Sequence, residues 1–525
     1  MSITKALPLP ASPLMSRDKS SPALVVAACI SLGLVALPIF YLAKRALGSD
    51  LETLQLIVFR AKTLEVFLTT LSLALSVAFL ATVLGFSLAW SLHNLRLPFP
   101  GTLRALTILP IAIPSYVFTY CWLSLGLFPG GYLPAILILT LSTTPYVTLA
   151  AFAALRRVDS SQIDVAQTLG LNQFQILRRV TLPQVRGALS AGALLVSLYV
   201  LSDFGAVSLL GVDTFTRAIQ NTYQGSFDRS SAAVLALMLV AVSAFVISLE
   251  ISSRKRSQIA RSSVSITKSP ELIDSLRLRV SGLALILSYI FFGLIAPLVV
   301  LLFRFLSRPE AIDYGRLLSA AYSSVLVASL GALIALVLAL PVALLAIRSS
   351  RVGKIAERGV LLVNALPGIV MGLALVAFGS DLPLVYQTIA LLALAYSILF
   401  LARSVGTIRT SLLKVPANLT EIAATLGQTR SQVFWRVTAP LAAPGILTGT
   451  LLVFLSAMKE LPATLMLRPT GFETLATEMW NNTAIFRFSE AAPYALTLVL
   501  IAALPTFLIS RPDRELNASS RGELQ

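Results

Sequence analysis

The sequence predicts an all-α, polytopic transmembrane bundle of about twelve helices in two pseudo-symmetric six-helix halves, and three observations support this fold class. First, 56% of the 525 residues are hydrophobic and only 12% are charged, whereas soluble domains average about 25% charged residues. Second, apolar runs long enough to cross a bilayer as a helix recur along the chain. Third, the sequence repeats itself at an offset of 257 residues. An ordinary soluble protein is thereby excluded.

Each apolar run is expected to be a helix, because lipid offers no partner for unpaired backbone N–H and C=O groups. The predicted spans are 22–43, 64–92, 104–128, 132–155, 187–211, 231–251, 280–306, 321–347, 359–379, 382–402, 443–467 and 490–510. Several spans contain prolines, which predict kinked or broken helices: Pro110, Pro114, Pro145, Pro297 and Pro367.

The distribution of basic residues orients these spans. With the N-terminus inside, 29 of the 41 Lys and Arg residues fall on the inner side and 11 in the outer loops. The positive-inside rule therefore predicts that both termini are cytoplasmic. The net charge of +17 is then explained by topology and by contact with the lipid bilayer, and no nucleic-acid partner is expected. The predicted domains are a cytoplasmic tail (1–21), a first half (22–255), a basic cytoplasmic linker (256–279), a second half (280–511) and a second tail (512–525).

The repeat is clearest in two loops that follow even-numbered spans. Residues 155–183 and 412–440 are identical at 11 of 29 aligned positions. Each copy is predicted to be two short helices separated by a glycine, Gly170 or Gly427, because glycine ends a helix cheaply in the left-handed conformation. The predicted helix starts are Asp159 with Gln162, Asn172 with Gln175, Asn418 with Glu421 and Thr429 with Gln432. Such a short, shaped element on the cytoplasmic side suits docking into a partner protein.

The spacing within these loops resembles the EAA loop of ATP-binding-cassette importer permeases. The first copy reads Asp164-Val-Ala-Gln-Thr-Leu-Gly170 and reaches Pro183; the second reads Glu421-Ile-Ala-Ala-Thr-Leu-Gly427 and reaches Pro440. The first copy departs from the family pattern in having Asp164 in place of Glu and Val165 in place of Ala. The resemblance implies that loops 159–183 and 416–440 dock onto two cytoplasmic ATPase subunits. The coupling residues it implies are Asp164, Ala166, Gly170, Pro183, Glu421, Ala423, Gly427 and Pro440.

Other stretches resemble fused, two-repeat ferric-iron importer permeases: Ser202–Gly205, Leu209–Gly211, Lys459–Leu465, Arg468-Pro469 and Phe472–Ala476. This resemblance implies a bacterial inner-membrane subunit that translocates Fe(III) delivered by a periplasmic ferric-iron-binding protein. It also implies alternating access driven by separate ATPase subunits, which bind ATP and Mg while this chain binds no cofactor. The chain contains no Gly-x-x-x-x-Gly-Lys-Ser/Thr phosphate loop, so we expect a transport subunit without an ATPase site and without catalytic residues.

Three charged residues, Asp203, Lys459 and Glu460, lie within predicted spans 5 and 11. A charge near the bilayer centre costs at least about 2.5–3.5 kcal/mol, so such residues usually face the bundle interior. Because Asp203 and Glu460 are related by the repeat, we expect them on opposite sides of a central path. Two interpretations stay open: the three residues line or gate a cation pathway, with Asp203 and Glu460 as tentative metal ligands, or Lys459 forms a structural salt bridge with one carboxylate.

Two alternative functions also stay open. The same importer class could carry another cargo, such as thiamin, a polyamine, sulfate or phosphonate, because cargo is chosen mainly by the binding protein. A secondary transporter driven by an ion gradient would instead need an ionisable relay through several spans, and only the cluster at 203, 459 and 460 is visible. A membrane-embedded enzyme is disfavoured because no catalytic set stands out.

Overall fold

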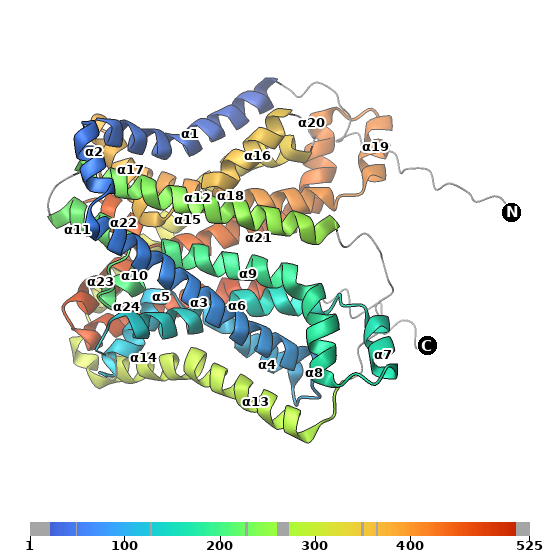
Figure 1. Cartoon of the computed structure of the whole chain (residues 1–525). Coiled ribbons are helices and arrows are strands. Elements are labelled where there is room, and N and C mark those ends of the chain that lie inside the picture. Colours follow the sequence, from blue (N-terminus) through green and yellow to red (C-terminus); the bar gives the residue numbers. More distant parts are fainter. Residues whose placement is uncertain are drawn as a thin grey trace.

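A computed structural model gives the structure of residues 22–48, 50–126, 129–225, 229–259, 272–347, 351–363 and 366–510. Within these ranges the regular elements are helices, and the only β-type pairing is one isolated bridge between Leu95 and Ile273. The long helices run side by side as a bundle (Figure 1). The predicted tails 1–21 and 512–525, and residues 260–271 of the predicted linker, lie outside the described residues.

The helices of the first sequence half are α1 (Pro22–Leu47), α2 (Leu51–Val58), α3 (Ala61–Asn94), α4 (Pro100–Ile108), α5 (Ser115–Ser124), α6 (Tyr132–Leu155), α7 (Ser160–Thr168), α8 (Gln173–Ile176), α9 (Leu182–Ser202), α10 (Gly205–Leu209), α11 (Phe215–Gly225) and α12 (Arg229–Ile259). Those of the second half are α13 (Leu276–Ile290), α14 (Ala296–Ser307), α15 (Tyr314–Ile347), α16 (Arg351–Val363), α17 (Gly368–Asp381), α18 (Ile389–Leu413), α19 (Ala417–Thr425), α20 (Arg430–Val433), α21 (Ala439–Met458), α22 (Pro462–Leu467), α23 (Leu475–Ala484) and α24 (Phe488–Ser510).

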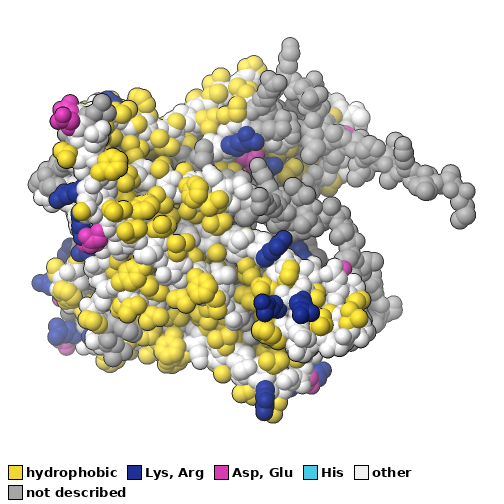
Figure 2. Space-filling model, in the orientation of Figure 1, with side chains coloured by type: hydrophobic (Ala, Val, Ile, Leu, Met, Phe, Trp, Pro, Cys, Tyr) yellow, Lys and Arg dark blue, Asp and Glu magenta, His cyan; other side chains and the backbone are white. Residues whose placement is uncertain are grey.

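The polytopic helical bundle is confirmed. The described residues contain nine helices that are long and apolar enough to cross a membrane, or ten if one bent pair counts as a span. Side chains on the surface agree with this: Figure 2 shows a broad apolar band over the middle of the molecule, with charged side chains towards its two ends.

Four predicted spans are not continuous helices. The spans 187–211 and 443–467 are interrupted at residues 203–204 and 459–461, after α9 and α21, and the other two are broken at prolines. In place of 104–128, α4 and α5 meet at an angle of 92°, joined by a short 3-10 turn at Leu109–Ala112. In place of 359–379, the helices α16 and α17 are separate, and α17 begins at Gly368. Prolines explain both breaks, because proline cannot donate a helix hydrogen bond. Pro114 and Pro367 hold nearly the same extended backbone, with ψ of 148° and 149°, at the start of α5 and α17.

Three π-helical turns have the same cause. They cover Leu177–Thr181, Phe291–Ile295 and Phe434–Thr438, and each ends two residues before a proline. A proline ring clashes with the carbonyl four residues earlier and leaves it without its N–H donor. The helix therefore widens locally and continues without a sharp break.

The two sequence halves interlock. Helix α1 packs against α15, α16 and α17 of the second half, whereas α13 packs against α3 and α4 of the first. Figure 1 shows α1 along one side of the bundle beside α16, and α13 along the opposite side beside α4. The first long helix of each half therefore packs against the other half, and this packing joins the two repeats.

Candidate functional site: two coupling loops and two acidic breaks

We call residues 159–183 and 416–440 the first and second coupling loops. Their short helices α7 and α8, and α19 and α20, lie at the same end of the bundle, on the right in Figure 1. The helices α11 and α23 lie at the other end. The structure therefore places both coupling loops on the same side of the bundle, as the repeat predicts.

In the first coupling loop, the Asp159 carboxylate caps α7 by accepting hydrogen bonds from the hydroxyl and, at 3.0 Å, the backbone N–H of Ser161. These hydrogen bonds lower the pKa of Asp159. Helix α7 ends where Gly170 takes a φ of +77°, so that Gly170 N–H reaches Gln167 O and Leu171 N–H reaches Ala166 O. This is the glycine-terminated helix end that the sequence predicts. The predicted capping box of Asn172 and Gln175 is present as well.

The second coupling loop repeats this geometry with one correction. Gly427 has a φ of +79°, its N–H reaches Ala424 O, and Gln428 N–H reaches Ala423 O. Thr429 and Gln432 exchange the predicted hydrogen bonds. The predicted capping box of Asn418 with Glu421 is wrong, because α19 already begins at Ala417 after Pro416 and has no side-chain cap. The fixed φ of proline suits the start of a helix without one.

Both coupling helices bury a small residue and expose larger apolar ones. Ala166 and Ala423 are buried. Their neighbours are open to the surroundings: Val165 is 58% and Leu169 74% exposed, and in the second copy Ile422 is 54% and Leu426 75% exposed. Each pair is four residues apart and therefore shares one helix face. Asp164, predicted to cap or contact a partner, lies exposed within α7 and caps nothing. Glu421 lies half-buried within α19.

Each coupling loop leads without interruption into a long helix. Pro183 and Pro440 lie in the first turn of α9 and α21, and the helical backbone is continuous over Gln173–Ser202 and Ser431–Met458. At the far ends of these two helices lie the acidic residues: Asp203 follows α9 directly, and Glu460 follows α21 after Lys459.

Asp203 is buried and joins three elements. Its Oδ1 accepts the backbone N–H groups of Ala206 at 2.9 Å and Val207 at 3.3 Å, which caps α10. Its Oδ2 accepts the hydroxyl of Ser115, the first residue of α5. The carboxylate thus links the end of α9, the start of α10 and the positive N-terminal end of α5. Both of its oxygens have protein partners.

Glu460 occupies the repeat-related position. Its Oε1 accepts the backbone N–H of Ala463, the first turn of α22, at 3.1 Å. A side chain on Gly368, the first residue of α17, would collide with that same oxygen. The carboxylate therefore lies against the N-terminal end of α17, as Asp203 lies against that of α5.

Lys459 does not form the salt bridge offered as one interpretation. Its Nζ donates to the backbone oxygen of Ile111, in the turn between α4 and α5 of the first half, at 3.2 Å. Neither Asp203 nor Glu460 is an ion-pair partner of Lys459 in the described part of the chain. The lysine instead connects the second half to the break in the first.

Comparison with known proteins identifies the family. The family "Binding-protein-dependent transport system inner membrane component" matches residues 81–256 and 331–514, which is most of both halves. The chain belongs to this family. It is 33% identical to the Fe(3+)-transport system permease protein FbpB 2 of Haemophilus influenzae over 92% of this chain and 97% of that protein. It is also 29% identical to sulfate permease 2, chloroplastic, of Chlamydomonas reinhardtii over 34% of this chain and 54% of that protein.

One further charged residue of this permease was missed in the sequence. Arg403 donates to the hydroxyl of Ser456 on α21 and is exposed halfway along α18. It lies near enough to Lys459, Glu460 and Tyr146 to interact with them electrostatically. The predicted span 382–402 began too early, so Arg403 seemed to lie beyond the membrane. The usable signal is Thr388, which caps α18 by accepting the backbone N–H of Leu391 at 3.2 Å.

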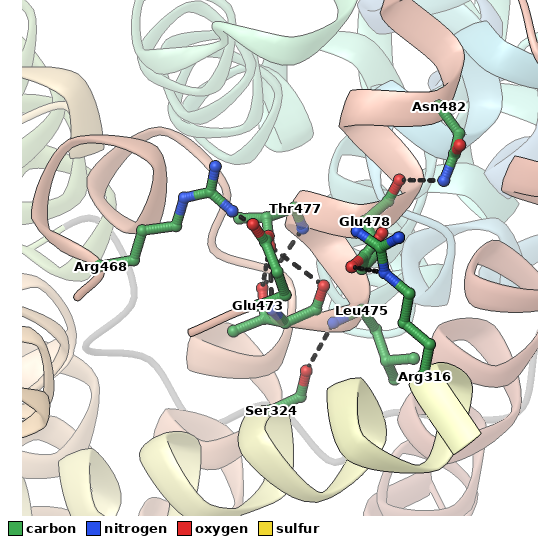
Figure 3. Close-up of polar contacts among 9 residues, drawn as sticks. Arg316, Ser324, Arg468, Glu473, Leu475, Thr477, Glu478 and Asn482 are labelled. Atoms are coloured by element: carbon green, nitrogen blue, oxygen red, sulfur yellow. Dashed lines mark hydrogen bonds and ion pairs between the residues drawn. The ribbon is translucent and has the colours of Figure 1, made fainter. Parts of the chain in front are cut away.

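The opposite end of the permease carries a second polar cluster around α23 (Figure 3). The buried Glu478 pairs with Arg316 of α15 at 2.7 Å, and Glu473 pairs with Arg468. Ser324 of α15 accepts the N–H of Leu475 at 2.8 Å, and the side chains of Thr474 and Thr477 complete a capping box. The contacts of Leu475 and Glu478 attach this segment to α15, and the Arg468–Glu473 pair joins the stretches 468–469 and 472–476 to each other. No group of three or more His, Cys, Asp or Glu side chains suited to a metal occurs among the residues that the structure describes.

Proposed function

We propose that this chain is the membrane-spanning permease subunit of an ATP-binding-cassette importer for ferric iron. A single observation carries this proposal: two matched coupling helices, at one end of the bundle, each continue into a long helix that ends at a buried or partly buried carboxylate. A partner that moves both coupling helices would thereby move α9 and α21, and with them the junctions at Asp203 and Glu460.

Two cytoplasmic ATPase subunits are the proposed partners at this end. The exposed pairs Val165 with Leu169 and Ile422 with Leu426 give each subunit an apolar face to bury, and large exposed apolar side chains commonly mark an interaction site. ATP and Mg belong to those subunits, and this chain contributes no catalytic residue. The end with α7 and α19 is then cytoplasmic, in agreement with the charge distribution, and both termini lie on that side of a bacterial inner membrane.

The opposite end is proposed to receive cargo from a periplasmic ferric-iron-binding protein. The assignment of iron is supported by FbpB 2, whose name gives Fe(3+) transport and which aligns over nearly its whole length. The sulfate permease aligns over only about half of its length, which gives weaker support to a sulfate cargo.

The central path is proposed to pass between α18 and the first half. An arginine exposed halfway along a membrane-crossing helix is costly in lipid. The face of α18 that bears Arg403 is therefore proposed to face water. Gly406 and Thr410 are exposed on the same face, one and two turns farther along. Lys459 and Glu460 lie close to Arg403 and are proposed to gate this path. The tightly held Asp203 supports a positioning role for that residue.

The test is co-purification with the ATPase subunits encoded for this importer. Ile422→Asp with Leu426→Asp should abolish co-purification and ATP-driven iron uptake, because two charges would replace an apolar docking face. Phe59→Asp is the matched control: Phe59 is 84% exposed and lies at the opposite end, between α2 and α3, so ATPase binding should persist. Normal co-purification of the double variant would overturn the docking proposal.

A further inference from the structure

A cavity of about 360 Å³ lies where the two halves meet at the coupling-loop end of the bundle. It is bounded by the segment after α3 and by the first two turns of α13, and Leu97, Pro98, Leu276, Val280 and Leu283 supply apolar walls. Arg96 and Arg279 supply two cationic side chains at the same cavity. The proposed function does not use this site.

The cavity is built from firmly joined elements. Ile273 N–H donates to Asn94 O at 2.8 Å, and Arg96 N–H donates to Ile273 O at 3.5 Å, which fixes the strand-like segment before α13 to the end of α3. Gly282 lets α13 approach closely, because a Cβ at this position would collide with Leu95. The relative positions of Arg96 and Arg279 therefore follow from the backbone.

The polar side of the cavity carries excess positive charge. Asp274 is shared by Arg279, at 2.8 Å, and Arg96, at 3.5 Å. Two guanidinium groups thus share one carboxylate and keep donors for a further acceptor, since each guanidinium has five N–H groups. Phosphate, like carboxylate, is an acceptor whose geometry such planar donors match.

The apolar side continues onto the lipid-facing surface. Leu276 is 75%, Val280 59% and the neighbouring Phe99 80% exposed. Exposed apolar side chains directly beside arginines, at the end of a membrane-crossing helix, match the border between acyl chains and headgroups. A free phosphate ion would leave this apolar wall uncovered, whereas a phospholipid would cover it.

We propose that this cavity binds one anionic phospholipid, whose phosphate contacts Arg96 and Arg279 and whose acyl chains lie along Leu276 and Val280. Because the arginines come from different halves, the bound lipid holds α13 of the second half against α3 of the first. Basic pockets between helices at this membrane depth are suited to anionic headgroups.

The test is native mass spectrometry of the purified full chain with equimolar phosphatidylglycerol and phosphatidylcholine. The wild-type chain should retain phosphatidylglycerol several-fold over phosphatidylcholine, and Arg96→Gln with Arg279→Gln should lower that ratio to about one. Arg60→Gln with Arg308→Gln removes the same charge from exposed positions at the other end and should keep the ratio. An equal loss in both double variants, or no preference in the wild-type chain, would overturn the proposal.

A second measurement needs no variant and so does not depend on folding of the mutants. A photoactivatable phosphatidylglycerol incubated with the wild-type chain should crosslink to the peptide that contains residues 272–283 in preference to other membrane-facing peptides. Excess unlabelled phosphatidylglycerol should suppress this crosslink, and excess inorganic phosphate should not. Uniform labelling of all lipid-facing peptides, or suppression by inorganic phosphate, would contradict a phospholipid site.

Discussion

The junctions at Asp203 and Glu460 build the same connection from different side chains. In the first half a short acid, Asp203, meets a residue with a hydroxyl, Ser115; in the second a longer acid, Glu460, meets Gly368, which has no side chain. Glu460 is one methylene longer than Asp203, and Gly368 lacks the hydroxymethyl group of Ser115. The combined side-chain volume of the two residues is therefore nearly the same in both halves. Both halves therefore place a carboxylate against the N-terminal end of a helix that follows a proline.

The alignment of the two halves also shifts along the chain. The acids and their capped N–H groups, Ala206 and Ala463, keep the 257-residue offset. The helix-starting prolines, Pro114 and Pro367, are only 253 residues apart. The sequence offset pairs Pro367 with Pro110 instead, which lies within the 3-10 turn. A fixed offset of 257 residues therefore pairs the equivalent acids of the two halves correctly, but it pairs the wrong prolines.

The largest effect should come from the coupling loops, where the two copies can be compared directly. Gly170→Pro or Gly427→Pro should each abolish ATPase co-purification and transport while membrane insertion persists, because proline cannot adopt a positive φ. Gly170→Asn and Gly427→Asn are the controls, since asparagine tolerates this conformation. If only the second substitution has an effect, the two loops are not equivalent. Normal co-purification of Gly427→Pro would refute the docking role of the second loop.

The next largest effect should come from Gly368→Ser. A hydroxymethyl group there collides with Glu460, and overpacking of this kind costs about 1–3 kcal/mol. The second change Glu460→Asp should restore the lost thermal stability, because it copies the Ser115–Asp203 arrangement. A double-mutant cycle on the melting temperature in detergent measures this coupling. Additive losses in the cycle would show that the two junctions are not interchangeable.

The reverse experiment at the first junction should have a similar or smaller effect. Ser115→Ala leaves Oδ2 of the buried Asp203 without its hydroxyl donor, a loss of about 1–3 kcal/mol. Ser115→Gly combined with Asp203→Glu should recover part of this loss. Thermal unfolding of the purified chain checks the prediction, and an unchanged melting temperature for Ser115→Ala would show that the hydroxyl is dispensable.

The smallest effect should come from the helix start that differs between the loops. Asp159→Ala should speed amide exchange in the first turn of α7 and leave α19 unchanged, because α19 has no side-chain cap. The Asp159 pKa is lowered, so the cap is present above the ordinary pKa of the carboxyl and is lost as pH falls through the lowered value. Exchange at neutral pH should therefore report a fully formed cap. Equal changes in α7 and α19 would contradict this assignment.

The sequence predicted the membrane-crossing bundle and the shape of the coupling loops because both depend on local rules. Hydrophobic length identifies spans such as α6, and glycine with capping residues defines the ends of α7 and α8. Asn418 was misassigned because a capping pattern three residues apart can also occur inside a helix that starts earlier, here after Pro416. Local pattern alone did not distinguish the two.

Features that depend on contacts between distant segments could not be predicted. No local pattern shows that Lys459 reaches Ile111 across the two halves, or that α1 packs on the second half. Arg403 was missed for a different reason: residues 382–388 are apolar enough to extend a hydropathy window, although Gln387 has a positive φ of 53° and the helix starts only at Ile389. Hydropathy measures composition and does not detect such a turn.

We propose that separate ATPase subunits drive this permease through its coupling loops. The most direct measurement is uptake of radioactive ferric iron into proteoliposomes that contain this chain, its ATPase subunits and its binding protein. We expect uptake that requires ATP and all three components, and that is lost with Ile422→Asp and Leu426→Asp. Uptake by the chain alone, driven by an ion gradient without ATP, would contradict it.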